Sequence, residues 1–169
     1  MKLLFVADPL DTFKTHKDST FAMMREAQKQ GLSVWACEAS SLRWQQGGLV
    51  QADARQINLN GQADSWYEVA AEATIALRDV DAVIMRKDPP FDTEYLYATH
   101  LLSQAEREGA RVFNRPQALR EHPEKLAILE FPAFITPTLV SSDMAALKAF
   151  HAQHRDAVSY THLTLPTSD

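Results

Sequence analysis

The sequence contains almost no cysteine, no excess of basic residues and no long apolar run, and each shortage excludes a class of protein. A single cysteine, Cys37, among 169 residues rules out an internal disulfide and favours a reducing compartment. A formal net charge of -5 disfavours sequence-independent binding to nucleic acid, which needs clustered lysine and arginine. No stretch approaches the roughly 20 apolar residues of a transmembrane helix. We therefore expect a cytoplasmic protein that binds small molecules and neither nucleic acid nor a membrane.

The common phosphate-binding and nucleophile motifs are also missing. There is no G-x-G-x-x-G after the first apolar segment, no G-x-x-x-x-G-K-S/T loop and no G-x-S-x-G elbow. Cys37 has no histidine or cation near it in the sequence, so we interpret it as a small buried residue in a strand rather than a catalytic thiol. The chain therefore brings no phosphate cradle of its own.

Apolar segments and helix caps alternate through the first part of the chain, which is typical of an open α/β sheet. Hydrophobic residues make up 46% of the sequence, enough for one good core. Helices are expected after Asp18 or Ser19 and after Asp92, and Gly31 and Gly109 end them. Continuous apolar runs predict strands covered on both faces at residues 3–7, 34–37, 80–85 and 112–113.

Two segments between the second and third of these strands depart from simple alternation. Gly47-Gly48 separates residues 42–44 from residues 49–59, which predicts a hairpin at the rim of the sheet. A helix is then expected to start at Asp64 or Ser65, because the next apolar positions follow the i, i+3, i+4, i+7, i+11 spacing of one helix face. These positions are Trp66, Val69, Ala70, Ala73 and Leu77.

The pattern changes after Arg115, and we expect a domain boundary near residues 121–123. Short helical pieces are expected at 117–120 and 124–130. Residues 1–120 form the first domain in this interpretation, and residues 121–156 begin a second one. A last helix is expected after Ser142 or Asp143. Residues 157–169 follow neither the helical nor the strand period, which predicts a flexible, unpacked tail.

Ligands of an open parallel sheet bind beyond the carboxyl ends of its strands, near helix N-termini. Residues 8–19, 86–92 and 114–116 are expected there. Arg86 and Lys87 follow a strand, and a planar arginine can hold a carboxylate or phosphate through two hydrogen bonds. The alternative is structural, with Arg86 in an ion pair with an aspartate in one of these loops. The aspartates concerned are Asp8, Asp88 and Asp92.

Two further motifs have simpler interpretations. His151 and His154 lie three residues apart on a predicted helix, but no carboxylate or thiol completes a metal site, so a solvated helix face is the better interpretation. Asp8 and Asp11 resemble the acidic start of a receiver domain, although the strand at 80–85 ends in Arg86 where a receiver would have an aspartate. A free-standing ligand-binding or receiver-like regulatory module is the alternative function.

Four loop segments resemble the bacterial glutathione synthetases, in the right order and from Met1 to about Asp156. They are KDSTFAM at residues 17–23, MRKDPPFDTEY at 85–95, NRPQALR at 114–120 and EKL at 124–126. The resemblance implies a Rossmann-like, mostly parallel α/β domain with helices on both faces that precedes an ATP-grasp fold, followed by the opening of that fold.

The resemblance also implies an activity and a set of site residues. The family joins γ-glutamylcysteine to glycine through an acyl phosphate, with ATP as phosphoryl donor, Mg²⁺ bridging the phosphates and a homo-oligomer as the assembled form. By analogy Arg86 faces the peptide together with Lys17, Asp18 and Ser19. Lys125 contacts the ATP phosphates.

The sequence departs from the family after Asp156. The family continues with a strand, a second ATP-binding lysine, a glycine-rich lid and acidic metal ligands, whereas residues 157–169 resemble translated adapter sequence. We therefore expect an incomplete ligase that is inactive alone, holds no metal and binds no cofactor tightly. The genomic reading frame beyond Asp156 distinguishes this expectation from the free-standing module.

Overall fold

The computed structural model describes residues 1–60, 65–123 and 125–159. It comprises two compact units that join in the sequence between Glu121 and His122. The first unit contains β1 (Lys2–Val6), η1 (Leu10–Thr12), α1 (Ser19–Lys29), β2 (Ser33–Cys37), η2 (Ala39–Ser41), β3 (Gln51–Leu59), β4 (Tyr67–Ala76), η3 (Leu77–Asp79), β5 (Ala82–Met85), α2 (Thr93–Arg107), β6 (Val112–Phe113) and α3 (Pro116–Glu121).

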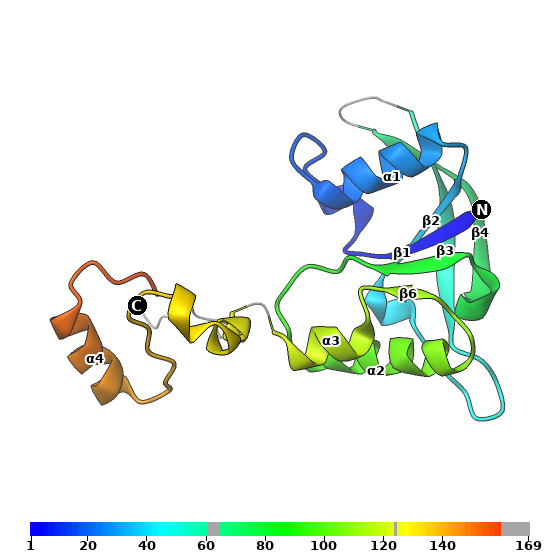
Figure 1. Cartoon of the computed structure of the whole chain (residues 1–169). Helices are drawn as coiled ribbons and strands as arrows, with labels where there is room; N and C mark the ends of the chain where they lie inside the picture. Colours follow the sequence, from blue (N-terminus) through cyan, green and yellow to red (C-terminus); the bar gives the residue numbers. More distant parts are fainter. Residues whose placement is uncertain (61–64, 124, 160–169) are drawn as a thin grey trace, which may run out of the picture. The chain divides into compact units, whose positions relative to one another are not determined.

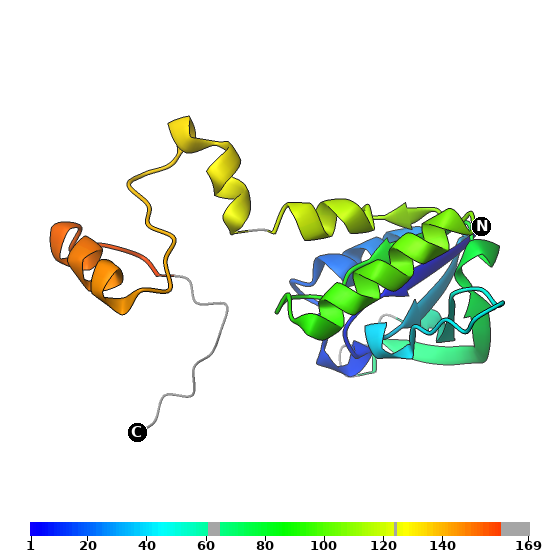
Figure 2. The same ribbon diagram turned by 90° about the horizontal axis from the view of Figure 1, so that it is seen from below.

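The six strands form one sheet in the order β4-β3-β2-β1-β5-β6, with helices on both faces (Figure 1). Strands β2, β1, β5 and β6 run parallel, whereas β3 and β4 pair antiparallel at one side. Helix α1 covers one face, and α2 lies along the other (Figure 2). The mostly parallel α/β fold expected from the sequence is confirmed.

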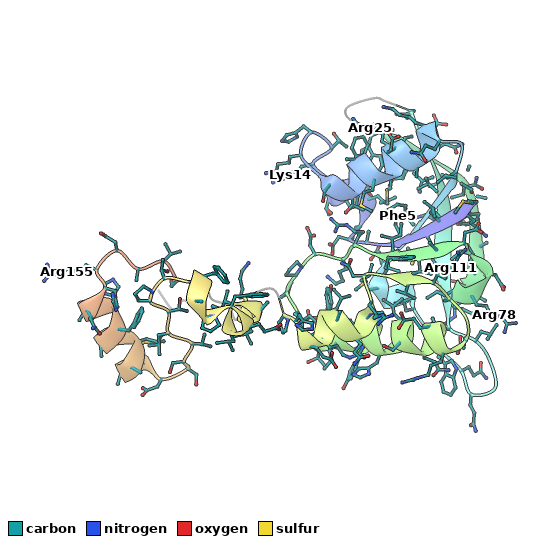
Figure 3. The ribbon with its side chains drawn as sticks, in the orientation of Figure 1. Phe5, Lys14, Arg25, Arg78, Arg111 and Arg155 are labelled. Atoms are coloured by element: carbon teal, nitrogen blue, oxygen red, sulfur yellow. The ribbon has the colours of Figure 1, made fainter. Side chains whose placement is uncertain are left out.

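Alternate side chains of β1 enter two separate cores. Leu4 and Val6 belong to the cluster under α2, while Phe5 points toward α1 and packs in a cluster with Met24 and Ala27 (Figure 3). Burial on both faces explains why the first strand is an unbroken apolar run instead of an alternating one. Val6 at the end of β1 pairs with Met85 at the end of β5, so the sheet holds these two strand ends side by side.

The helix predicted after residue 64 or 65 was wrong, because Tyr67–Ala76 is strand β4. Its backbone pairs with β3 from Leu59↔Tyr67 to Gln51↔Ala76, with a bulge where the register shifts between Gln56 and Ile57. Of the supposed apolar helix face, Val69 is 42% exposed. The alanine- and glutamate-rich sequence favours a helix locally, but pairing with β3 along the whole strand overrides that propensity.

Other local predictions are confirmed by the structure. Asp18 and Asp92 cap α1 and α2, and their carboxylates accept hydrogen bonds from the backbone N–H of Phe21 and Tyr95. Arg43 and Gln51 form an antiparallel bridge on either side of Gly47, whose φ of 80° suits the turn predicted there.

The second unit consists of short helical pieces. They are η4 (Leu126–Glu130), η5 (Pro132–Phe134) and α4 (Met144–Gln153), and Asp143 caps α4 as expected. None of the residues described between 122 and 159 is buried. Of the tail predicted at 157–169, residues 157–159 are exposed, and the rest lie outside the described residues.

Candidate functional site

Two neighbouring parallel strands, β1 and β5, end side by side at one edge of the sheet. The loop after β1 begins at Asp8, and the loop after β5 begins at Arg86. The Arg86 N–H donates a hydrogen bond of 2.7 Å to the Val6 carbonyl, so the two loops start from one fixed point. This is the edge at which open α/β sheets bind their ligands.

Asp8 joins the two loops. Its carboxylate accepts a hydrogen bond of 2.7 Å from the Asp88 backbone N–H and forms an ion pair of 3.2 Å with the Lys87 ammonium. Lys87 and Asp8 therefore neutralise each other, and the backbone of the Asp88 loop is held in place.

Arg86 is bound by hydroxyl groups and not by a carboxylate. Its Nε donates to Thr20 Oγ1 at 3.0 Å and its Nη2 donates to Ser19 Oγ at 2.7 Å, both in the first turn of α1. Among the residues that the structure describes, none forms an ion pair with Arg86, so the structural ion-pair alternative is not the arrangement found. Three of its five N–H donors stay available to an anion.

The N-terminus of α1 adds further positive potential beside Arg86. Helix N-termini carry a partial positive charge and favour anions. The Asp18 carboxylate accepts from the Phe21 N–H at 2.9 Å, which satisfies one of the free amides of the first turn. The fold thus brings Arg86 beside this helix end, although Arg86 and Thr20 lie 66 positions apart in the sequence.

A cavity of about 230 Å³ opens at this place. Asp8, Thr12, Phe13, Asp18, Thr20, Arg86, Asp88 and Pro89 line it. Of the residues that the sequence suggested, Arg86 and Asp18 line the cavity, and Ser19 contacts Arg86. Lys17 is exposed and is not among the lining residues. Lys125 belongs to the second unit, immediately before η4.

Thr12, Phe13, Asp88 and Pro89 line the cavity and lie in the segments 8–19 and 86–92 that were expected at this edge, although none of the four was proposed as a site residue. Thr20, which also lines the cavity, lies just beyond the first of these segments. All of them lie in the loops after β1 and β5 or at the start of α1. That β1 and β5 are direct neighbours, which brings these two loops together, is shown by the strand order of the sheet.

Tyr95, in the first turn of α2, is buried close to the charged side chains of the cavity. Burial is the largest influence and raises the pKa of its hydroxyl. The charge of Arg86 lowers that pKa, whereas the charge of Asp88 raises it. The charge of Asp8 raises that pKa as well.

The other candidates for chemistry have little support. His154 packs its ring against Phe150 at 4.5 Å, and no group of three metal-ligating side chains occurs in the described ranges. None of the helices in those ranges is both long and apolar enough to cross a bilayer.

Cys37 is buried at the end of β2, and burial raises the pKa of its thiol to about 12. The neutral thiol is a poor nucleophile, because the thiolate is the reactive form. At neutral pH the native chain should therefore resist alkylation by iodoacetamide, whereas the urea-unfolded chain should take up one label. Intact mass spectrometry measures both states. Rapid labelling of the native chain would contradict the assignment of Cys37 as a buried structural residue.

Comparison with known proteins identifies the family. Residues 1–120 match the family described as prokaryotic glutathione synthetase, N-terminal domain. The chain is 49% identical over 158 residues to a glutathione synthetase of Ralstonia nicotianae, 48% over 162 residues to one of Neisseria meningitidis serogroup A, and 44% over 158 residues to one of Vibrio cholerae. These matches cover 94% of this chain and 48%, 51% and 49% of those relatives, so the chain spans about half of their length. The chain belongs to the prokaryotic glutathione synthetase N-terminal domain family.

Proposed function

We propose that this chain is the peptide-holding part of an ATP-dependent ligase that joins γ-glutamylcysteine to glycine. The observation that carries the proposal is Arg86, a guanidinium without an ionic partner among the described residues, which lines a cavity at the ligand-binding edge of the sheet. A substrate carboxylate supplies the charge that this guanidinium lacks. The relatives named glutathione synthetase support a peptide substrate of this chemistry.

In the proposed reaction, a cysteinyl carboxylate oxygen attacks the γ-phosphorus of ATP, which gives an acyl phosphate and ADP. The glycine amine then attacks the carbonyl carbon, and inorganic phosphate leaves as the amide bond forms. The task of this domain is positioning, because holding two reactants in the right geometry removes much of the entropic cost of their reaction. Arg86 and the loop of Lys17, Asp18 and Ser19 do this for the peptide.

Residues 121–156 are proposed to begin the ATP-grasp domain, with Lys125 at the ATP phosphates. Mg²⁺ bound to the phosphates would stabilise the charge that develops during transfer. We assign no residue of this chain to Mg²⁺, because no set of three suitable ligands gathers anywhere in the described ranges. We further propose that the assembled enzyme is a cytoplasmic homo-oligomer.

The proposal is tested by fusing residues 1–156 to the part of the Ralstonia nicotianae relative that follows the matched region. The fusion should form glutathione from γ-glutamylcysteine, glycine, ATP and Mg²⁺, whereas the 169-residue chain alone should give no turnover above a blank. Chromatographic detection of glutathione measures both. A folded fusion without activity would contradict the proposed function, and turnover by the chain alone would contradict its role as a positioning domain.

A further inference from the structure

We infer that Trp66 and Tyr67, at the start of β4, are positioning residues that hold the loop of residues 8–18 against the antiparallel side of the sheet. Neither residue lines the cavity, so each acts only through the loop. The effect on catalysis rests on the proposed function, which gives the cavity a peptide to hold. The inference extends that function by assigning a role to β4, a strand that contributes no residue to the cavity lining.

The loop after β1 has little regular structure of its own. It runs from Asp8 to Asp18, and its one helical turn is η1. The backbone N–H groups of Thr12 and Phe13 donate to carbonyls three residues earlier in the chain, at 2.9 and 3.2 Å. So short a 3-10 turn has poor hydrogen-bond geometry and little stability by itself. The middle of the loop therefore depends on contacts with other parts of the fold.

Tyr67 supplies a polar contact to this loop. Its hydroxyl donates a hydrogen bond of 2.7 Å to Asp11 Oδ1, across 56 positions of sequence. That bond is the largest influence on the phenol and raises the pKa of Tyr67, burial raises it further, and Arg55 on β3 lowers it. The phenol therefore stays protonated at neutral pH and keeps its ability to donate.

Trp66 supplies an apolar contact to the same part of the loop. Its side chain is buried and stacks on Phe13, with 5.7 Å between the ring centroids and 15° between the ring planes. The Trp66 ring is itself held from two other sides, by Phe21 of α1 at 5.1 Å and by Tyr67 at 4.7 Å. Leu10 is buried in the same cluster. Phe13 thus packs on a surface that α1 and β4 fix together.

These two contacts determine where one wall of the cavity lies. Asp11, which Tyr67 holds, directly precedes Thr12 and Phe13, and both of these line the cavity. A wall that is fixed before the ligand arrives reduces the entropy lost on binding. The pairing of β4 with β3, which begins at Leu59↔Tyr67, therefore supports the loop from outside the cavity.

The test is Tyr67→Phe, which removes the hydroxyl and keeps the ring that packs on Trp66. In the 169-residue chain, hydrogen exchange followed by NMR should be about two- to tenfold faster at the Thr12 and Phe13 amides, the range for losing one hydrogen bond. Tyr97→Phe is the matched control, since it removes a hydroxyl from an exposed tyrosine of α2 and should leave these rates unchanged.

Substitutions of Asp11 show whether the contact is the one assigned. Asp11→Ala should speed exchange at the same amides, and adding Tyr67→Phe to it should have almost no further effect, because the contact is already lost. Asp11→Asn should recover part of the protection, since its amide oxygen can still accept from the phenol.

Kinetics of the fusion enzyme distinguish positioning from stability alone. Tyr67→Phe should raise the KM for γ-glutamylcysteine about two- to tenfold, with kcat and the KM for ATP almost unchanged. A loss of stability without a change of the loop would leave the peptide KM as it is and lower only the melting temperature.

Unchanged exchange at Thr12 and Phe13 in Tyr67→Phe would overturn the inference, and so would fully additive effects of Tyr67→Phe and Asp11→Ala. Faster exchange with an unaltered peptide KM in an active fusion would overturn the positioning role. A folded fusion that makes no glutathione would contradict the proposed function instead. The exchange measurement needs no activity, so it decides in that case too whether Tyr67 holds the loop.

Discussion

Replacing Arg86 with lysine in the fusion enzyme should lower kcat/KM for γ-glutamylcysteine by roughly thirty- to a thousand-fold, or about 2–4 kcal/mol. Lysine keeps the positive charge but loses the planar fork, and it cannot donate to Ser19 and Thr20 while also holding a carboxylate through two bonds. The loss should be found mainly in the KM for the peptide, with the KM for ATP almost unchanged. Steady-state kinetics with each substrate varied in turn measures this division.

Lys125→Met in the same fusion should affect the use of ATP and not of the peptide, in contrast to Arg86→Lys. If Lys125 meets the ATP phosphates, its removal should weaken ATP binding or slow acyl phosphate formation, with the peptide KM roughly intact. The two variants therefore have opposite kinetic signatures. Should Arg86→Lys leave both KM values and kcat unchanged and lower only the thermal stability, Arg86 would be a structural residue.

Leu102→Ala should lower the free energy of unfolding by about 2–5 kcal/mol, the range for truncating a fully buried leucine. Leu102 has no exposed surface and lies on α2 in the cluster that contains Leu4 and Val83. Its loss removes apolar contacts and leaves a cavity between the helix and the sheet. Urea unfolding followed by circular dichroism measures the change.

Tyr97→Ala is the matched control, because Tyr97 lies on the same helix with 63% of its surface exposed. Its effect should be within about 0.5 kcal/mol, as for most surface substitutions. Similar losses in the two variants would contradict the assignment of which face of α2 packs on the sheet.

The order of strands and helices around β1 and β5 could be predicted from the sequence, because their apolar runs and caps act locally. Asp18 and Asp92 stand directly before helices, where an aspartate satisfies free backbone amides whatever the rest of the fold does. Arg86 could be recognised as a candidate from local sequence as well, because it directly follows the continuous apolar run of β5.

The strand β4 could not be predicted in this way. Residues 67–76 are rich in alanine and glutamate, and only the partner strand β3 makes them extended. That partner acts across the sheet, at positions such as Gln51↔Ala76 that local periodicity does not contain. A strand that is stabilised mainly by pairing with its neighbour need not show the alternating apolar and polar residues of a typical strand.

The site itself was only partly accessible to sequence reasoning. Asp8 pairs with Lys87, and in the described ranges Arg86 and Asp88 have no ionic partner. This arrangement depends on the geometry at the ends of two strands, which local sequence does not contain. Residue type alone left the ion-pair and binding-site interpretations of Arg86 equal. In the structure Arg86 donates to the hydroxyls of Ser19 and Thr20 and not to a carboxylate, and this is a long-range contact that local sequence does not indicate.

In the proposed function this chain holds a peptide whose cysteinyl carboxylate is activated by phosphoryl transfer, and isotope transfer tests that claim most directly. γ-Glutamylcysteine labelled with ¹⁸O in its cysteinyl carboxylate is converted by the fusion enzyme, and the inorganic phosphate is analysed by mass spectrometry. One labelled oxygen should appear in the phosphate, because the attacking oxygen leaves with phosphorus when glycine displaces it. Label in the glutamyl α-carboxylate should stay in the glutathione. Glutathione formed with unlabelled phosphate from the first peptide would contradict the account.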